Sequence, residues 1–181
     1  MRGRSGWTTL LRMKLPRWTG PVLLVAALAG GAFLAYEGLA PRPRSPEVSY
    51  TLLNGSQKHS GQWNGKVMLV NFWATSCTTC VAEMPEVVAT YEKFKGRGFD
   101  TLAVAMSYDP PAYVANFVET RKLPFSVAID NTGEVAKSFG KVQLTPTTFL
   151  INKRGEIVKR YVGAPDFAAL HGLVEQLLAE S

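Results

Sequence analysis

The stretch 67–85 reads VMLVNFWATSCTTCVAEMP and places two cysteines at a junction between a strand and a helix. Residues 67–73 are apolar and rich in β-branched and aromatic side chains, which predicts a strand buried on both faces. Apolar residues then recur at spacings of three and four through residue 94, which predicts an amphipathic helix. We therefore expect Cys77 at or next to the helix N-cap and Cys80 one turn inside the helix.

This position favours thiol chemistry. The N-terminus of a helix has unsatisfied N–H groups and a partial positive charge, and a thiol there can have its pKa lowered from about 8.5 to roughly 3.5–7.5. Two intervening residues allow Cys80 to reach Cys77 and close a short disulfide. We expect Cys77 to attack a substrate disulfide and Cys80 to resolve the mixed disulfide.

A zinc site is the main alternative for such a cysteine pair, because half of a four-ligand site has the same spacing. The chain has only two cysteines, and neither His59 nor His171 has ligand spacing to them. The pattern therefore predicts redox chemistry and no metal, and we expect both histidines at the surface. Trp63 and Trp73 are expected to pack in the core.

The net charge of +6 comes entirely from the N-terminal segment. Residues 1–46 contain seven basic residues and one acidic residue, whereas the remainder contains equal numbers of both. A neutral folded part gives no electrostatic basis for binding nucleic acid, and we exclude that class of partner.

The N-terminal segment has the pattern of a membrane anchor. Residues 1–17 are basic, and residues 18–39 are almost free of charge. The continuous apolar run over 21–36 is longer than the roughly 7–15 residues of a secretory h-region and shorter than the roughly 20 residues of a spanning helix. Flanking Glu37 and Pro41 make a poor signal-peptidase site, which favours an uncleaved anchor over a cleaved signal peptide. The positive-inside rule leaves 1–17 in the cytoplasm and the rest across the membrane. Residues 40–46, APRPRSP, are expected to form an extended tether.

Residues 47–181 are expected to form one α/β domain. Its first part, around the Asn54-Gly55 turn, predicts a β-hairpin. Strands and helices then alternate as β-α-β-α-β-α, and a final β-β-α follows, with a strand over 144–151 that begins at a proline. This order predicts a mixed central sheet flanked by helices.

Three motifs in this order, VNFWATSCTTC with Pro85, LTPTTFLI, and KRGEIV with Gly163, resemble the thioredoxin fold. The domain is most similar to the membrane-tethered TlpA/ResA/CcmG group of thiol–disulfide interchange proteins. The resemblance implies that Pro146 is a cis-proline facing the cysteines, and that the backbone of Thr145 binds an extended substrate. A proline at the first position of a strand agrees with this role.

The same resemblance implies that Glu83 is a buried acid that tunes the thiols and relays protons. The position of an acid in thioredoxin corresponds to Asn71, which cannot exchange a proton, so Glu83 is the better candidate. Ser76, which we include in the substrate-binding surface, stands where these families usually have tryptophan. Thr79 stands where they usually have proline or histidine. Both differences affect the expected substrate and the redox direction.

The resemblance implies a membrane-bound, periplasmic or extracellular reductase of protein disulfides without a cofactor. Its partners would be the lipid bilayer, a membrane-embedded thiol electron donor and substrates such as apocytochrome c or thiols of oxidase metal sites. Three alternatives remain open from the sequence: a copper-binding assembly chaperone, a disulfide-forming oxidase and a peroxidase. The peroxidase is disfavoured because the proline of its usual Pro-x-x-x-Thr-x-x-Cys setting is absent before Cys77.

Overall fold

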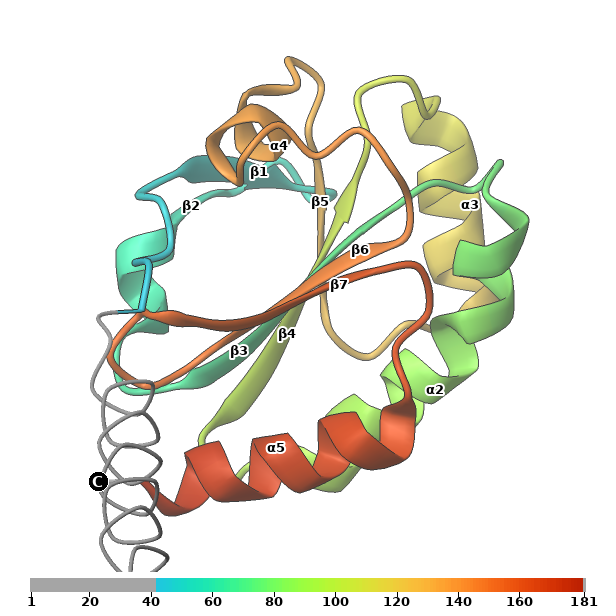
Figure 1. The fold of residues 1–181 in the computed structure, drawn as a ribbon. Helices are drawn as coiled ribbons and strands as arrows, with labels where there is room; N and C mark the ends of the chain where they lie inside the picture. Colours follow the sequence, from blue (N-terminus) through green and yellow to red (C-terminus); the bar gives the residue numbers. More distant parts are fainter. Residues whose placement is uncertain (1–41, 181) are drawn as a thin grey trace, which may run out of the picture. The chain divides into compact units, whose positions relative to one another are not determined.

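The computed structural model describes residues 42–180, which contain a seven-stranded mixed sheet in the order β2-β1-β5-β4-β3-β6-β7 (Figure 1). The predicted α/β thioredoxin-like fold with an N-terminal hairpin is confirmed. The elements are, in chain order, β1 Ser49–Leu52, β2 Gln57–His59, the 3-10 helix η1 Ser60–Trp63, β3 Val67–Trp73, α2 Thr78–Phe94, β4 Phe99–Ala105, α3 Pro111–Arg121, β5 Ser126–Ile129, α4 Glu134–Ser138, β6 Thr147–Ile151, β7 Ile157–Val162 and α5 Phe167–Ala179.

Strand β3 forms the middle of the core. All seven of its residues are buried, as the apolar run predicts. It pairs in parallel with β4 and antiparallel with β6, and both faces of the sheet are covered. A strand buried on both faces has no reason to alternate apolar and polar residues, which explains its nearly continuous apolar sequence.

Two hydrophobic clusters lie on opposite faces of the sheet. One contains buried side chains of α2, α3 and α5, and the other contains those of η1 and α4. Helices α2, α3 and α5 lie on one side of the sheet and α4 on the other (Figure 1). Trp73 belongs to the first cluster and Trp63 to the second, so the prediction that both tryptophans pack in the core is confirmed. Side chains on both faces of the sheet thus hold β3 in place.

His171 is half-buried, so the prediction that it lies at the surface is confirmed only in part. Its Nε2 lies 2.8 Å from the Thr90 hydroxyl, and its ring packs edge-on against Phe94 with the ring centroids 5.5 Å apart. Partial burial lowers the pKa of His171. His59 is exposed, as predicted, and its Nδ1 accepts a hydrogen bond from the N–H of Gly61.

The chain enters the domain beside the turn between β6 and β7. The N–H of Ser45 donates to the carbonyl of Gly155 at 2.8 Å, and the carbonyl of Pro43 accepts from the N–H of Ile157 at 2.8 Å. Part of the segment expected as a tether therefore lies against the sheet. Because β6 runs antiparallel to β3, with Ile151 opposite Met68, this turn lies at the end of β3 that is far from Cys77.

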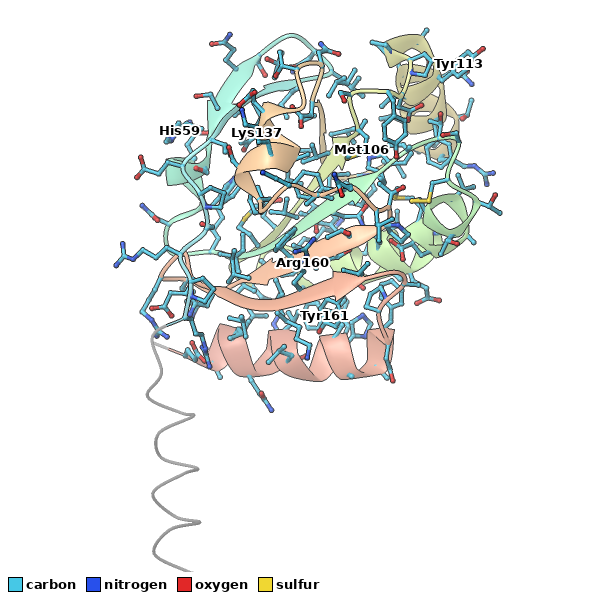
Figure 2. All side chains as sticks on the ribbon, turned by 45° about the horizontal axis from the view of Figure 1, so that its top comes forward. His59, Met106, Tyr113, Lys137, Arg160 and Tyr161 are labelled. Carbon is cyan, nitrogen blue, oxygen red and sulfur yellow. A yellow bond between two sulfur atoms is a disulfide. The ribbon has the colours of Figure 1, made fainter. Side chains whose placement is uncertain are left out.

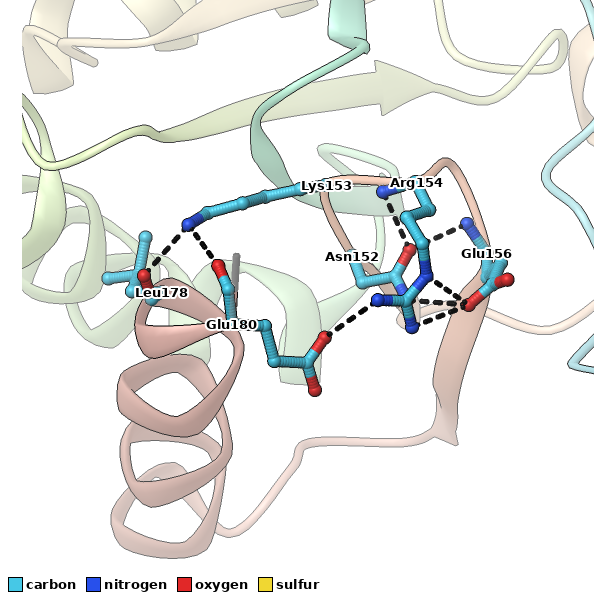
Figure 3. A network of polar contacts seen from close by, with 6 residues as sticks. All are labelled: Asn152, Lys153, Arg154, Glu156, Leu178 and Glu180. Carbon is cyan, nitrogen blue, oxygen red and sulfur yellow. Dashed lines mark hydrogen bonds and ion pairs between the residues drawn. The ribbon is translucent and has the colours of Figure 1, made fainter. Parts of the chain in front are cut away.

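The same turn holds the C-terminal end of α5 (Figure 3). The Lys153 ammonium donates to the carbonyls of Leu178 and Glu180, at 2.9 and 2.5 Å. These carbonyls have no partner within the helix, and a cation at this end also interacts favourably with the helix dipole.

The predicted cytoplasmic segment 1–17 and transmembrane helix 18–39 lie outside the described residues. Between residues 42 and 180, no helix has both the length and the hydropathy needed to cross a membrane.

We expect Lys153→Met to lower the free energy of unfolding by about 1 kcal/mol, because it removes the cation from the end of α5. Lys159→Met is the matched control, since Lys159 is exposed on β7 and has no side-chain partner among the described residues. Chemical denaturation of the oxidised full-length protein measures both. Equal effects of the two substitutions would contradict this role of Lys153.

Candidate active site

Cys77 is the N-cap residue of α2, as predicted. Its N–H donates to the carbonyl of Ala74 at 3.1 Å, which closes the tight connection after β3. Its Sγ accepts a hydrogen bond from the N–H of Cys80 at 3.1 Å. A sulfur atom therefore takes the place of the oxygen that serine, threonine or aspartate usually provides at an N-cap.

Cys77 and Cys80 form a disulfide, and the two sulfurs differ in exposure (Figure 2, yellow bond). Cys77 is half-buried, whereas Cys80 has an exposed fraction of 0%. A substrate can therefore reach only the sulfur of Cys77. In the reduced protein, the N–H of Cys80 and the positive end of the helix dipole are placed to stabilise a thiolate on Cys77.

The peptide bond between Thr145 and Pro146 is cis. Thr147 pairs with Phe72 on β3, so this bond lies beside the end of β3 that leads to Cys77. Strand β6 begins at Thr147, directly after the proline, and not at residue 144 as the sequence suggested. Pro146 is buried, and its carbonyl accepts from the N–H of Gly163 at 2.8 Å. Thr145 is half-buried, and its main-chain N–H and C=O have no hydrogen-bond partner within residues 42–180.

Glu83 is buried on α2, with an exposed fraction of 5%. Its Oε1 accepts a hydrogen bond from the side-chain amide of Asn71 at 3.1 Å, and the same amide donates to the Thr148 hydroxyl at 2.9 Å. Within the described residues, Oε2 of Glu83 and Oδ1 of Asn71 have no partner. Asn71 thus supplies no acid of its own, but its amide hydrogen-bonds and positions the carboxyl of Glu83.

Burial raises the pKa of Glu83 to about 7, against a smaller lowering effect of the hydrogen bond from Asn71. A carboxyl with this pKa is present in both protonation states near neutral pH, which is the range in which proton transfer to and from a group is most effective. Glu83 follows Cys80 by three residues on α2, so the two side chains lie on the same side of the helix.

The sequence analysis missed Asp109. This buried carboxylate accepts two hydrogen bonds from Thr75, one from the N–H at 2.6 Å and one from the hydroxyl at 2.5 Å. Thr75 precedes Cys77 by two residues, so Asp109 fixes the connection that leads to the accessible cysteine. One signal was available: Asp109 follows the neighbouring parallel strand β4, and polar residues at the carboxyl ends of such strands often contribute to sites.

Tyr108 was also missed, and nothing in the local sequence pattern singles it out. Its hydroxyl lies 3.3 Å from the hydroxyl of Thr145. Ser76, predicted as part of the substrate-binding surface, is exposed beside Cys77. The ends of β4, β3 and β6 therefore bring Tyr108, Cys77 and Thr145 to one edge of the sheet.

The redox centre of this edge is the pair of sulfurs. Among residues 42–180, no group of three or more histidine, cysteine, aspartate and glutamate side chains is arranged to hold a metal ion. A half-buried nucleophilic sulfur, a buried second sulfur and a buried acid on one helix can exchange two electrons and two protons with another dithiol or disulfide.

The comparisons with known proteins agree with this chemistry. Residues 42–175 match the Redoxin family. The thiol-disulfide oxidoreductase ResA of Bacillus cereus is 33% identical over 159 residues, which cover 83% of this chain and 91% of the relative. ResA of Halalkalibacterium halodurans is 34% identical over 150 residues, covering 82% of this chain and 79% of the relative.

Solved structures show the same fold. The crystal structure of a thiol:disulfide interchange protein of the thioredoxin family from Chlorobium tepidum superposes with a TM-score of 0.70. It is 27% identical in sequence, and the superposition covers 77% of this chain and 99% of that one. Together with the geometry of the Cys77–Cys80 pair, these matches show that the chain belongs to the Redoxin family and is a thiol–disulfide oxidoreductase of the TlpA/ResA/CcmG group.

Proposed function

We propose that this oxidoreductase works as a reductase of protein disulfides, with its folded domain in the periplasm or at the cell exterior. The observation that carries the reaction is the difference between the two sulfurs: Cys77 is accessible at the helix N-cap, and Cys80 is fully buried behind it. This difference gives each cysteine one role in a two-step exchange.

In the first step, the thiolate of Cys77 attacks one sulfur of the substrate disulfide. A bond forms between Cys77 and that sulfur, and the bond between the two substrate sulfurs breaks. The second substrate sulfur leaves as a thiolate and takes up a proton. Thiolate attack of this kind passes through a mixed disulfide.

In the second step, the thiolate of Cys80 attacks the sulfur of Cys77. The mixed disulfide breaks, the first substrate sulfur leaves as a thiolate and takes up a proton, and the Cys77–Cys80 disulfide seen in the structure forms. The substrate has then gained two electrons and two protons, and the protein has lost the same number. Burial prevents Cys80 from meeting the substrate directly but does not prevent it from meeting Cys77.

Glu83 is proposed to take the proton that the Cys80 thiol must lose before it attacks. A buried thiol is reluctant to ionise, because burial disfavours the charged form. A neighbouring carboxylate with a pKa of about 7 is able to accept that proton near neutral pH and to release it later. The free Oε2 of Glu83 is the acceptor atom within the described network.

The oxidised protein needs two electrons from a donor before the next cycle. The chain has no third cysteine, so an internal relay is not available. An oxidising compartment does not supply reducing equivalents, and we propose a membrane-embedded dithiol carrier as the donor. The expected transmembrane helix 18–39 would keep the domain near that carrier. The chain enters the domain at the end of β3 far from Cys77, which leaves the disulfide end available to both partners.

The substrate class proposed from the resemblance is a protein with a disulfide at a metal or haem site. Apocytochrome c and the copper-site thiols of an oxidase under assembly belong to this class, because their cysteines must be reduced before they bind their cofactors.

We expect Cys80→Ser to trap a mixed disulfide between Cys77 and a model protein disulfide, because the second step is missing. Cys77→Ser, the matched control, is expected to form none, since Cys80 is buried. Non-reducing electrophoresis and mass spectrometry identify the product. Trapping through Cys80, or trapping by neither variant, would contradict the assigned roles.

In intact cells, a membrane-impermeant thiol reagent is expected to label the reduced full-length protein.

We expect Glu83→Gln to remove a pH dependence of stability. The raised pKa means that the folded protein holds a proton that the unfolded chain releases between about pH 4.5 and 7. Stability of the wild-type protein therefore falls as pH rises through this window, by on the order of 2 kcal/mol. The variant is expected to lack this fall and to exchange disulfides at least about tenfold more slowly at pH 7.

Glu86→Gln is the control for this experiment, because Glu86 is exposed on the same helix. Denaturation curves at pH 5 and pH 8, together with rates of substrate reduction, give both readouts. If Glu83→Gln and the wild-type protein show the same pH dependence of stability, the buried acid is not the titrating group.

A further inference from the structure

Exposed apolar side chains gather around the cis-proline loop. Tyr108 is 56% exposed, Leu144 66% and Val162 58%. Leu144 directly precedes Thr145, Val162 is paired with Thr147, and the Tyr108 hydroxyl contacts Thr145. Large apolar side chains that remain exposed at one place indicate a surface that another molecule covers.

Tyr108 is held in position, although it is not part of the core. The next residue, Asp109, is buried and binds Thr75 through both carboxylate oxygens, which ties the Tyr108 loop to the connection before Cys77. On its other side, the hydroxyl of Tyr108 contacts Thr145 at 3.3 Å. The loop that carries Tyr108 is therefore held against the connection before Cys77, and the hydroxyl of Tyr108 reaches the cis-proline loop.

The order of the strands places this ring beside the nucleophile. The sheet runs β4-β3-β6, and the N–H of Met106 donates to the carbonyl of Trp73 at 3.0 Å, so the loops after β4 and β3 start side by side. Ser76, the residue before Cys77, has a small side chain and offers no flat surface. Tyr108 is thus the aromatic residue that the neighbouring loop supplies to this surface.

The main chain of Thr145 is available for an extended segment. Neither its N–H nor its C=O has a hydrogen-bond partner within the part of the chain that the structure describes. A segment paired there would run next to Cys77, with a side chain close to its cysteine directed at Tyr108 and Leu144. Aromatic rings gain from contact with aromatic and aliphatic side chains, and a loop that Asp109 already holds in place loses little entropy on binding.

We propose that Tyr108 is a specificity-determining residue, and that the substrate is an extended protein segment with an aromatic or large aliphatic residue next to its disulfide cysteine. This proposal rests on the proposed function, since it concerns the substrate of the same pair of sulfurs. It adds a criterion for which protein disulfides are reduced, which the chemistry of the sulfurs alone does not supply.

The test uses the reduced full-length protein and three disulfides. Two are synthetic peptides that differ only in the residue before the cysteine, phenylalanine or serine, and the third is bis(2-hydroxyethyl) disulfide, which has no side chain to bind. We compare the wild-type protein with Tyr108→Ala, which removes the ring, and Tyr108→Phe, which removes only the hydroxyl. Tyr113→Ala is the matched control, because Tyr113 is 65% exposed and lies on α3 away from the disulfide (Figure 2).

We expect the wild-type protein to reduce the phenylalanine peptide about tenfold faster than the serine peptide, in second-order rate constants. Tyr108→Ala is expected to abolish this preference, because it lowers the rate with the phenylalanine peptide by more than the rates with the serine peptide and the small disulfide. Tyr108→Phe and Tyr113→Ala are expected to keep the preference.

Three results would overturn the proposal: no preference in the wild-type protein, equal losses for all three disulfides in Tyr108→Ala, or loss of the preference in Tyr113→Ala as well. Failure of the proposed function gives a different result, because the wild-type protein would then reduce none of the three disulfides.

Discussion

The hydrogen bond from the N–H of Cys80 to the Sγ of Cys77 is the interaction on which the site depends. It exists because β3 ends at Trp73 and a tight connection places Cys77, four residues later, at the N-cap of α2. The accessible sulfur of Cys77 then occupies the N-cap, where unsatisfied N–H groups and the helix dipole favour negative charge. A thiolate is the reactive form of cysteine, so the same interaction that begins the helix also prepares the nucleophile.

Two sets of hydrogen bonds support the residues around Cys77. Asp109 fixes the connection before Cys77 through Thr75, and the network of Asn71, Glu83 and Thr148 lies buried between α2 and the sheet. Burying a carboxyl costs free energy unless the group is hydrogen-bonded or neutral. Glu83 has one amide donor and a pKa of about 7, which keeps it partly neutral at physiological pH. The buried carboxyl of Glu83 therefore adds little to the stability of the fold, but it is suited to exchanging protons.

Much of this could be predicted from the sequence, because it depends on local patterns. The apolar run of β3, the periodicity of α2 and the position of Cys77 at its N-cap follow from residues close together in the chain. Tyr108 and Asp109 could not be found in this way, because their role depends on β4 lying next to β3. The contacts of His171 could not be predicted for a similar reason, because they are made by Thr90 and Phe94, which α2 brings to α5.

The reduction potential of the Cys77–Cys80 pair tests the proposed reductase most directly. The full-length protein is equilibrated with glutathione or dithiothreitol buffers, and the fraction of disulfide is measured after thiol alkylation. The account predicts a value near or below that of thioredoxin, roughly −270 mV, at which the dithiol passes electrons to protein disulfides. A value near that of a strong oxidant such as DsbA, roughly −120 mV, would contradict it and indicate a protein that forms disulfides instead.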